Sequence, residues 1–473
     1  MAHAAAEKVE DLWKLVGVFG ARLLAAILLT LSLSAQTNPP QQPGQQDSTN
    51  NGSPDSTQPL DQLNQSLPAW LQFNGQYRNR VERSSGIGYR AVADTYDLSQ
   101  LRLELSLQPF WWLTFLGETQ DAEVFFNQQT ASAPPYQNTW DIRQAYVELG
   151  NSRKGWFDVA VGRQVLSFGK ERVIGPSDWL NMGRTFDAIR ADLHHAGYNL
   201  SLFASSVIVA RDGVIDHHIQ GNNLHGAYGR LEKLLPRAAL EPYVLWRVAP
   251  AQLRLSENAG RGTLNEVTVG FRWQGRLPAH FDYEIEMDKQ VGSLGPDSIH
   301  AWAGHWNTGW KFVSGPGTPR VYVEGNYASG TNDPNSRTWG TFDQIYPSSH
   351  NKLDFADRVG WRNIEQARPG IEETLGRSWK FTETYESFWL ASARDAFYGT
   401  NGAPVAQSPS GVAGRHIGQE VDGWAEWKYR SVEIGFGYGH LFPGGFLRRT
   451  TTGSGFTYPF FYLTYAFTRT PEL

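Results

Sequence analysis

A period-two alternation of apolar and polar residues constrains the fold of this chain more than any other feature of its sequence. It recurs between residues 70 and 467, for example where Val267, Val269 and Phe271 are separated by Thr268 and Gly270. Successive side chains of an extended strand point to opposite faces, so this period predicts β-strands with one apolar face each. Such segments follow one another to the end of the chain, and we therefore predict an all-β protein.

The polar faces of these predicted strands are charged, and this decides which side faces water. Asp282, Glu284, Glu286 and Asp288 take four successive positions on one polar face. In a soluble β-sandwich two apolar faces share a core, and no helical segments supply a covering layer here. A membrane barrel instead turns its apolar faces to lipid and its polar faces to a watery lumen. The pattern favours this barrel over a secreted β-solenoid or sandwich.

Composition and segment length agree with a membrane barrel. The chain is 13% aromatic and contains 48 Gly, yet its mean hydropathy of −0.43 is that of a polar protein. The segments have roughly the 9–11 residues that a tilted strand needs to cross a bilayer. We predict a large antiparallel transmembrane β-barrel of about 18 strands (16–18), wide enough for an open channel. Stretches rich in Gly, Pro, Asn, Asp and Ser predict long extracellular loops that plug or narrow it, at 164–184, 210–222, 330–376 and 396–414.

The N-terminus has the layout of a secretory signal. Lys8, Lys14 and Arg22 precede the short apolar run 23–31, and small residues lead to a cleavage site near Ala35. The predicted divisions are a signal peptide over 1–35, a disordered Gln/Pro/Asn/Ser-rich periplasmic tract over 36–68, the barrel over 69–467 and a short tail over 468–473. A cleaved signal before a membrane barrel predicts the outer membrane of a Gram-negative bacterium.

Several classes of function find no support in the sequence. A chain without Cys has no disulfide, no thiolate metal site and no cysteine nucleophile. The motifs G-x-S-x-G, H-E-x-x-H and G-x-x-x-x-G-K-[ST] are absent, so we expect neither an enzyme nor a cofactor. The net charge of −5 does not indicate the basic surface expected of a nucleic-acid-binding protein. Neither His194-His195 nor His217-His218 can bind one ion from a regular strand, because adjacent strand residues point to opposite faces, so we predict no metal site. A surface metal at His217-His218, in a predicted loop with Asp212 and Asp216, is the alternative.

Several spaced stretches resemble the alginate-export family of outer-membrane porins. They are GRQVLSFG at 162–169, GPSDW at 175–179, GRTFDAIR at 183–190, TFDQIYPSSH at 341–350, DRVGWRNIEQARPGIE at 357–372, SFWLASARDAFYGTNG at 387–402, GQEVDGWAEWKYR at 418–430 and FGYGHLFPGGFL at 436–447. The resemblance implies a monomeric barrel of about eighteen strands whose electropositive lumen is narrowed by loops. It implies secretion of an anionic polysaccharide, with periplasmic secretion-complex proteins and the lipopolysaccharide-bearing outer membrane as further partners.

Arginine supplies a chemistry that suits such a substrate. Of the 42 Lys and Arg residues 32 are Arg, whose planar guanidinium binds a carboxylate through paired hydrogen bonds. A conduit for uronate units needs several such groups, each of which binds the polymer well enough for it to enter and weakly enough for it to move on. The candidates for the substrate path are Arg78, Arg80, Arg163, Arg184, Asp187, Arg190, Arg362, Arg368, Arg394 and Arg415.

The acidic residues and the direction of transport leave alternatives open. We expect the carboxylate row 282–288 mainly to pair with lumen arginines, a divalent-cation site being the other possibility. The resemblance to the alginate-export family also implies a few acids in the basic passage, for which Asp187, Asp357 and Asp395 are candidates. Lumen arginines can also serve only as structural partners of acids across the barrel. A passive uptake porin for anionic sugars or small carboxylates would share the fold and the basic lumen, so both directions remain possible.

Overall fold

The computed structural model describes residues 59–151, 154–234, 236–250, 262–312, 317–333 and 335–468. The predicted signal peptide, most of the tract over 36–68 and all but the first residue of the C-terminal tail lie outside the described residues. No helix among the described residues is long and apolar enough to cross a membrane.

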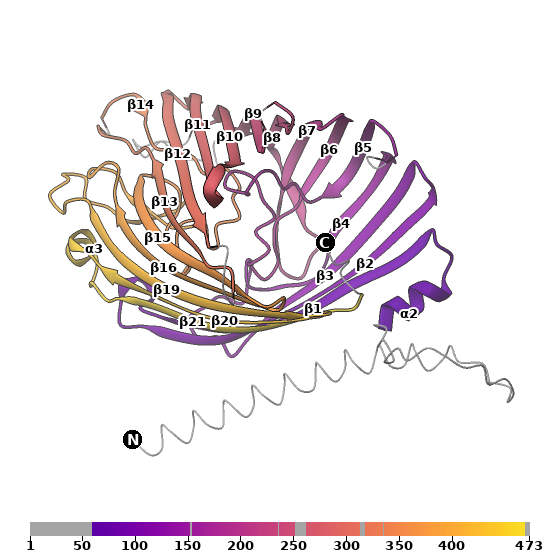
Figure 1. Ribbon diagram of the computed structural model, residues 1–473. Coiled ribbons are helices and arrows are strands. Elements are labelled where there is room, and N and C mark those ends of the chain that lie inside the picture. Colours follow the sequence, from indigo (N-terminus) through magenta and orange to yellow (C-terminus); the bar gives the residue numbers. More distant parts are fainter. Residues whose placement is uncertain are drawn as a thin grey trace, which may run out of the picture.

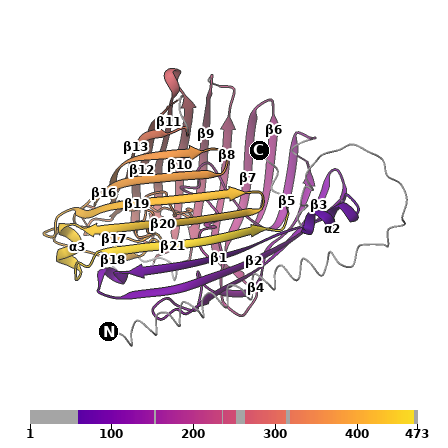
Figure 2. The same ribbon diagram turned by 60° about the horizontal axis from the view of Figure 1, so that its bottom comes forward.

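Eighteen antiparallel strands form a closed barrel, as the alternation predicts (Figures 1 and 2). They are β1 (Leu71–Ser85), β2 (Ala93–Phe110), β3 (Leu113–Phe125), β4 (Asn138–Gly150), β5 (Phe157–Gln164), β6 (Phe186–His195), β7 (Tyr198–Val209), β8 (His217–Leu231), β9 (Ala238–Ala249), β10 (Leu264–Arg276), β11 (Phe281–Leu294), β12 (Asp297–Lys311), β13 (Arg320–Ala328), β15 (Ile364–Leu375), β16 (Trp379–Trp389), β19 (His416–Tyr429), β20 (Val432–Pro443) and β21 (Phe456–Ala466).

The ring closes between the first strand and the last. Tyr77 of β1 lies opposite Leu101 of β2 on one side and opposite Tyr465 of β21 on the other. Closure leaves no strand edge with unpaired backbone groups, which a structure inside a bilayer requires. The elements outside this ring are the strands β14 (Thr338–Trp339), β17 (Phe397–Tyr398) and β18 (Pro404–Ala406), the helices α2 (Pro59–Ser66) and α3 (Gly445–Thr450), and the 3-10 turns η1 (Ile87–Tyr89) and η3 (Pro278–His280).

The two ends of the barrel differ in their connections. At one end, here called the turn end, short turns such as 196–197 and 430–431 join the strands. Both ends of the described chain also lie there, where Leu60 N donates a hydrogen bond to Phe467 O at 3.2 Å. The long connections, among them 165–185, 329–363 and 390–415, lie at the opposite end, here called the loop end.

Side-chain exposure confirms that the barrel is apolar outside and polar inside. On β10, Val269 is 51% exposed, whereas its neighbour Arg272 on the opposite face is only 2% exposed. Trp246 and Phe436 are likewise about half exposed on the outer surface, at 46% and 52%. A soluble sheet would show the reverse, since apolar side chains would be its buried ones. The outer surface is therefore suited to lipid.

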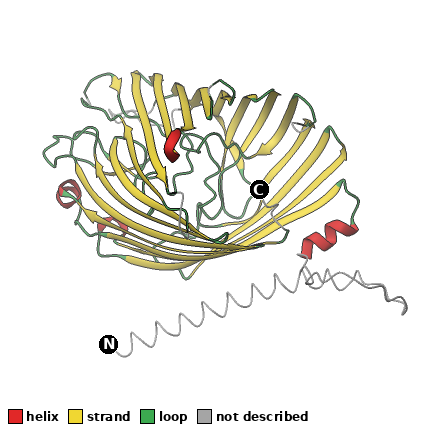
Figure 3. Cartoon of the chain, in the orientation of Figure 1, coloured by secondary structure: helices red, strands yellow, loops and turns green. Residues whose placement is uncertain are grey.

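A compact apolar cluster lies inside the barrel rather than in its wall. It joins loop residues such as Leu166, Ile174 and Phe342 to inward-facing wall residues such as Phe186 and Tyr243. Figure 3 shows the loops crossing the interior of the ring. The lumen at the loop end is thus filled by folded chain.

The structure corrects three of the predicted boundaries. The loop predicted over 330–376 ends at residue 363, because 364–375 forms strand β15; Pro369 and Gly370 hide its alternation. The tract predicted to be disordered to residue 68 contains helix α2, whose Asn64 exchanges two 2.8 Å hydrogen bonds with the backbone of Phe73. The loop predicted over 210–222 ends at 216, since β8 begins at His217.

Candidate functional site

Three long loops turn into the lumen at the loop end and fill part of it. They comprise residues 165–185, 329–363 and 390–415, and we call them together the plug. Main-chain contacts join them: Ile174 and Tyr346 form a parallel bridge, and Gly360 N donates a hydrogen bond to Tyr398 O at 2.9 Å. The plug therefore behaves as one body that contacts the wall from several sides.

Arginines on the first strand hold the 165–185 loop by its backbone. Arg78 donates hydrogen bonds to the carbonyl oxygens of Asp178 at 2.8 Å and Leu180 at 3.0 Å. Arg80 donates to Trp179 O at 2.6 Å, and its guanidinium lies 4.0 Å from the centre of the Trp179 ring. Arg80 also pairs with Glu82 on the same strand face. These inward guanidinium groups thus bind chain oxygens of the plug.

The carboxylate of Asp178 binds two further arginines of the wall. Arg102 of β2 and Arg143 of β4 approach its Oδ1 at 2.9 and 3.0 Å, and Arg143 also pairs with Glu118 at 2.6 Å. Burial alone would raise the pKa of Asp178, but the two guanidinium groups hold that pKa below its ordinary value. Gly183 makes room for this contact, because a Cβ there would stand 3.0 Å from Asp178 Oδ1. The lumen of the described structure therefore contains a bound carboxylate, supplied by the chain itself.

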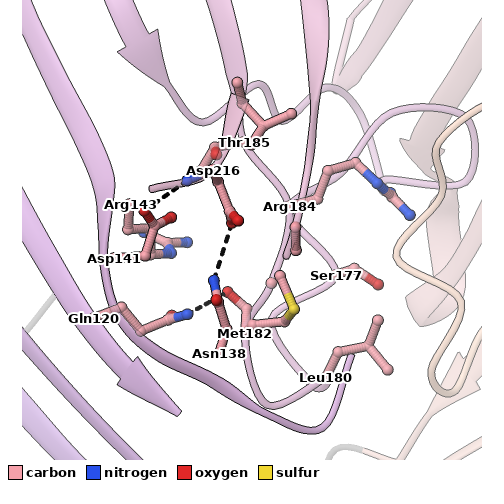
Figure 4. Close-up of a pocket in the computed structure, with 13 residues that line it drawn as sticks. Gln120, Asn138, Asp141, Arg143, Ser177, Leu180, Met182, Arg184, Thr185 and Asp216 are labelled. Atoms are coloured by element: carbon pink, nitrogen blue, oxygen red, sulfur yellow. Dashed lines mark hydrogen bonds between the residues drawn. The ribbon is translucent and has the colours of Figure 1, made fainter. Parts of the chain in front are cut away.

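A small cavity separates the 165–185 loop from β3 and β4 (Figure 4). Its volume is about 110 Å³, and its polar lining includes Asn138, Asp141, Arg143, Arg184 and Asp216. Asn138 donates a 2.9 Å hydrogen bond to Asp216. Burial, together with the neighbouring Asp141, raises the pKa of Asp216 to about 7.

Arg184 is the arginine of this cavity whose charge has no carboxylate partner within ion-pair distance among the described residues. It donates to the carbonyl oxygens of Gly175 at 3.1 Å and Pro347 at 2.9 Å. Burial lowers its pKa to about 10, which still leaves the guanidinium charged at neutral pH. An anion entering the cavity would meet this group.

The 329–363 loop is attached to the opposite side of the wall. Arg172 pairs with Glu324 of β13 at 3.2 Å and donates to Lys352 O at 3.1 Å, while Arg247 of β9 pairs with Asp343 at 2.5 Å. Burial and the nearby Arg172 lower the pKa of Lys352 to about 8. The plug is therefore held to the wall by ion pairs and carbonyl contacts on both sides of the lumen.

Among the predicted path residues, those facing the lumen mostly have partners. Arg362 donates to Gly402 O at 3.3 Å, and Arg368 pairs with Glu386 at 2.8 Å; both lie within or beside the plug. Arg190 pairs with Asp192 at 2.7 Å in the turn-end half, where a quarter of its side chain is exposed. Together with Arg78, Arg80 and Arg184 these residues line the lumen or its plug.

The other predicted path residues lie elsewhere. Arg163 shares the outer face of β5 with Val161, and it pairs with Asp187 of β6 at 3.1 Å. Arg394 is an exposed residue of the 390–415 loop, and Arg415 is exposed and pairs with Glu365 at 2.5 Å. The two further acids belong to the plug. Asp357 pairs with His350 at 2.9 Å, and Asp395 accepts a hydrogen bond from Tyr398 at 2.7 Å.

The carboxylate row of β11 divides into two pairs. Asp282 pairs with Arg320 at 2.6 Å and Glu284 with Arg272 at 3.0 Å, as predicted. Glu286 and Asp288 instead both accept hydrogen bonds from the Tyr243 hydroxyl, at 2.8 and 2.7 Å. Half of the row thus neutralises lumen arginines.

The histidine pairs behave as strand geometry requires. His194 faces the lumen and contacts Asp158 at 3.0 Å, whereas His195 is exposed on the other face of β6. His218 contacts Asp187 at 2.8 Å at the start of β8. No group of three or more His, Asp or Glu side chains with metal-binding geometry occurs among the described residues.

Arg102, Arg143 and Asp178 form the central contact of the site, and the sequence alone does not single them out. The alternation does indicate that Arg102 faces the lumen, because it lies on the same polar strand face as Glu104. Arg78 lies on the polar face of β1 in the same way. The pairing of β2 with β3, and of β3 with β4, brings Arg102 and Arg143 near each other. Asp178 cannot be found in this way, because its position depends on how the loop folds.

Comparison with known proteins gives a family and a fold. A family model described as alginate export matches residues 69–458. No curated protein matches the chain. The structure is similar to crystal structures of outer-membrane porins. The sequence identities are low, so the similarity concerns the fold alone.

Three of these solved structures illustrate the likeness. OccAB2 of Acinetobacter baumannii is 9% identical with a TM-score of 0.56, over 83% of this chain and 97% of that one. OpdO of Pseudomonas aeruginosa is 11% identical with a TM-score of 0.54, over 85% and 98%. OpdK of the same species, solved with vanillate, is 9% identical with a TM-score of 0.51, over 84% and 98%.

Proposed function

Because the chain belongs to the alginate export family, we propose that this outer-membrane channel carries an anionic, uronate-rich polysaccharide out of the cell. The family and the fold support a transport channel rather than an enzyme.

One observation carries the proposal: Arg102 and Arg143 bind a carboxylate inside the lumen, at 2.9 and 3.0 Å. A uronate unit presents the same carboxylate chemistry to the same guanidinium forks. Asp178 thus stands where a polymer carboxylate would bind. A polymer that replaces Asp178 at these arginines would free the 165–185 loop from β2 and β4 and open the path.

The turn-end half of the lumen suits the passage of such a polymer without trapping it. Arg190, Arg272 and Arg320 point inward there, and each has an acidic partner within 3.0 Å. A paired guanidinium attracts an anion less strongly than a free one, because its partner already occupies part of its charge and its donors. Weak, repeated binding is what conduction requires.

Planar-bilayer recording of the purified protein tests the proposal. The channel should prefer anions, and added polyuronate should block its current while a neutral glucan of the same length does not. The charge-balanced variant Arg102→Gln/Asp178→Asn removes one arginine and its internal partner together. It should be blocked less strongly than Asp178→Asn alone, which frees both Arg102 and Arg143. A cation-selective channel that is indifferent to polyuronate would remove the export function and leave only the fold.

A second candidate is a passive uptake porin for small carboxylates. The cavity of about 110 Å³ beside Arg184 favours it, because that space suits a small anion better than a polymer. OpdK, which is similar in fold, was solved with vanillate, although a likeness at 9% identity speaks for the fold alone. Swelling of proteoliposomes in small carboxylates, without any block by polyuronate, would favour uptake over export.

A further inference from the structure

The outer wall of the barrel contains an apolar groove near the turn end. It has a volume of about 560 Å³ and runs over the outward faces of β7 to β10. Leu200, Ala227, Pro242 and Val244 line it, and Trp156 stands at its turn-end margin. Because this face of the wall meets lipid, the groove is open to an acyl chain.

The groove exists because two residues interrupt the surface of the wall. Gly229 has no side chain at the outward position opposite Leu200. Pro242 has no backbone N–H to donate, and the pairing of β8 with β9 passes from Tyr228–Tyr243 directly to Leu231–Leu240. The missing side chain and the gap in the ladder leave a hollow between bulkier neighbours.

Exposed cations surround the turn-end margin of this groove. His195 lines the groove itself, while Lys233 follows two residues after Leu231 and Lys154 precedes Trp156 by two residues. Lys233 also lies across the 196–197 turn, since a Cβ on Gly197 would meet its Cε at 3.0 Å. Two acids described nearby already have basic partners. Glu232 pairs with Arg230 at 2.8 Å, and Asp158 contacts His194 at 3.0 Å. Lys154 and Lys233 therefore give this margin positive charge, and it lies at the short-turn end, which faces the periplasm in outer-membrane barrels.

We propose that this groove is a binding site for an anionic phospholipid of the periplasmic leaflet. One acyl chain lies over Gly229 and Ala227, and the phosphate meets Lys154, His195 and Lys233. The apolar floor supplies affinity for the chain, and the cationic margin selects an anionic headgroup over a zwitterionic one. This site requires only the barrel and is independent of what the channel carries.

The test uses the full-length protein exchanged into micelles with equal amounts of phosphatidylglycerol and phosphatidylethanolamine of identical acyl chains. Native mass spectrometry then counts the retained lipids. The wild type should retain phosphatidylglycerol in preference, and Lys154→Gln and Lys233→Gln should each reduce that preference about fivefold. Equal retention of the two lipids by the wild type would overturn the proposal.

Filling the groove supplies the second arm of the test. Gly229→Leu should abolish lipid retention. Ala227→Leu, which fills the groove without replacing Gly229, should do the same. Gly423→Leu is the matched control, since Gly423 lies on the outer face of β19 and a Cβ added there would have nothing within 4 Å. Retention that persists in both groove variants, or that is lost in the control as well, would contradict a site at this groove.

Discussion

Asp178 supplies the carboxylate at the centre of the contact between the 165–185 loop and the wall. It binds Arg102 and Arg143, two groups that, under the proposed function, would otherwise attract the carboxylates of the polymer. Their charge holds the pKa of Asp178 down, although burial works against it. A depressed carboxyl pKa means that the contact persists at neutral pH and is lost only as the pH falls through that lowered value.

Replacing Asp178 with Asn should therefore make the channel bind polyuronate more tightly. A hydrogen bond to a charged group contributes roughly 1.5–3 kcal/mol, so the half-blocking concentration should fall about tenfold or more. Blocking curves in planar bilayers measure this directly. Asp333→Asn, which removes an exposed carboxylate of the 329–363 loop, should leave the curve unchanged. An unchanged curve in Asp178→Asn would show that Asp178 does not compete with the polymer.

We expect Lys352 to make the anion preference of the channel depend on pH near neutrality. Burial and Arg172 lower its pKa to about 8, so the ammonium is positive below that pH and neutral above it. The anion preference should fall as the pH rises from 7 to 9, measured as a shift in reversal potential. Lys352→Arg should keep the preference high across this range, and Lys352→Gln should keep it low. Asp216→Asn separates the contribution of Asp216, whose pKa is about 7.

At the scale of the element, each barrel strand has one face for lipid and one for the lumen. Val269→Arg places a charge on the lipid face of β10 and should lower the free energy of unfolding by about 2–4 kcal/mol. Ser106→Arg places the same charge on the half-buried lumen face of β2 and should change it far less. Urea titration in lipid vesicles measures both. Equal destabilisation would mean that the faces are wrongly assigned.

The side chain of Asn64 anchors helix α2 to the first strand of the barrel. Asn64 exchanges two 2.8 Å hydrogen bonds with the backbone of Phe73 at the turn end. Asn64→Ala removes both, and each contributes roughly 0.5–1.5 kcal/mol. We expect faster proteolytic cleavage before residue 70 while the barrel remains folded, and an unchanged cleavage rate would contradict this anchoring.

Strands can be predicted from this sequence and the plug cannot, for a physical reason. Alternation is local, so β10 and β11 are visible in their own residues. The pattern does not predict β15, because Pro369 and Gly370 interrupt it. The inward fold of the loops depends on distant contacts, such as Ile174 with Tyr346 and Arg78 with the carbonyl of Asp178. Strand parity finds Arg102 and also places Arg163 on the outward face with Val161. It cannot reveal that Arg163 pairs with Asp187 of the neighbouring strand.

At the scale of the whole molecule, the protein is a wide barrel whose loops fill part of its lumen. Charged contacts join wall and plug in both directions, because Asp178 of the plug binds Arg102 of the wall and Arg172 of the plug binds Glu324 of the wall. Under the proposed function, we expect a polyanion to displace the plug by offering carboxylates to Arg102 and Arg143 in place of Asp178. We expect a neutral polymer not to do so.

Efflux from proteoliposomes tests this claim most directly. Vesicles containing the purified channel are loaded with a fluorescent oligouronate or with a neutral oligosaccharide of equal length, and release is followed over time. We predict rapid release of the oligouronate, slow release of the neutral sugar, and faster oligouronate release through Asp178→Asn. Equal release of both sugars, or retention of both while small carboxylates escape, would contradict a plug that opens to polyanions.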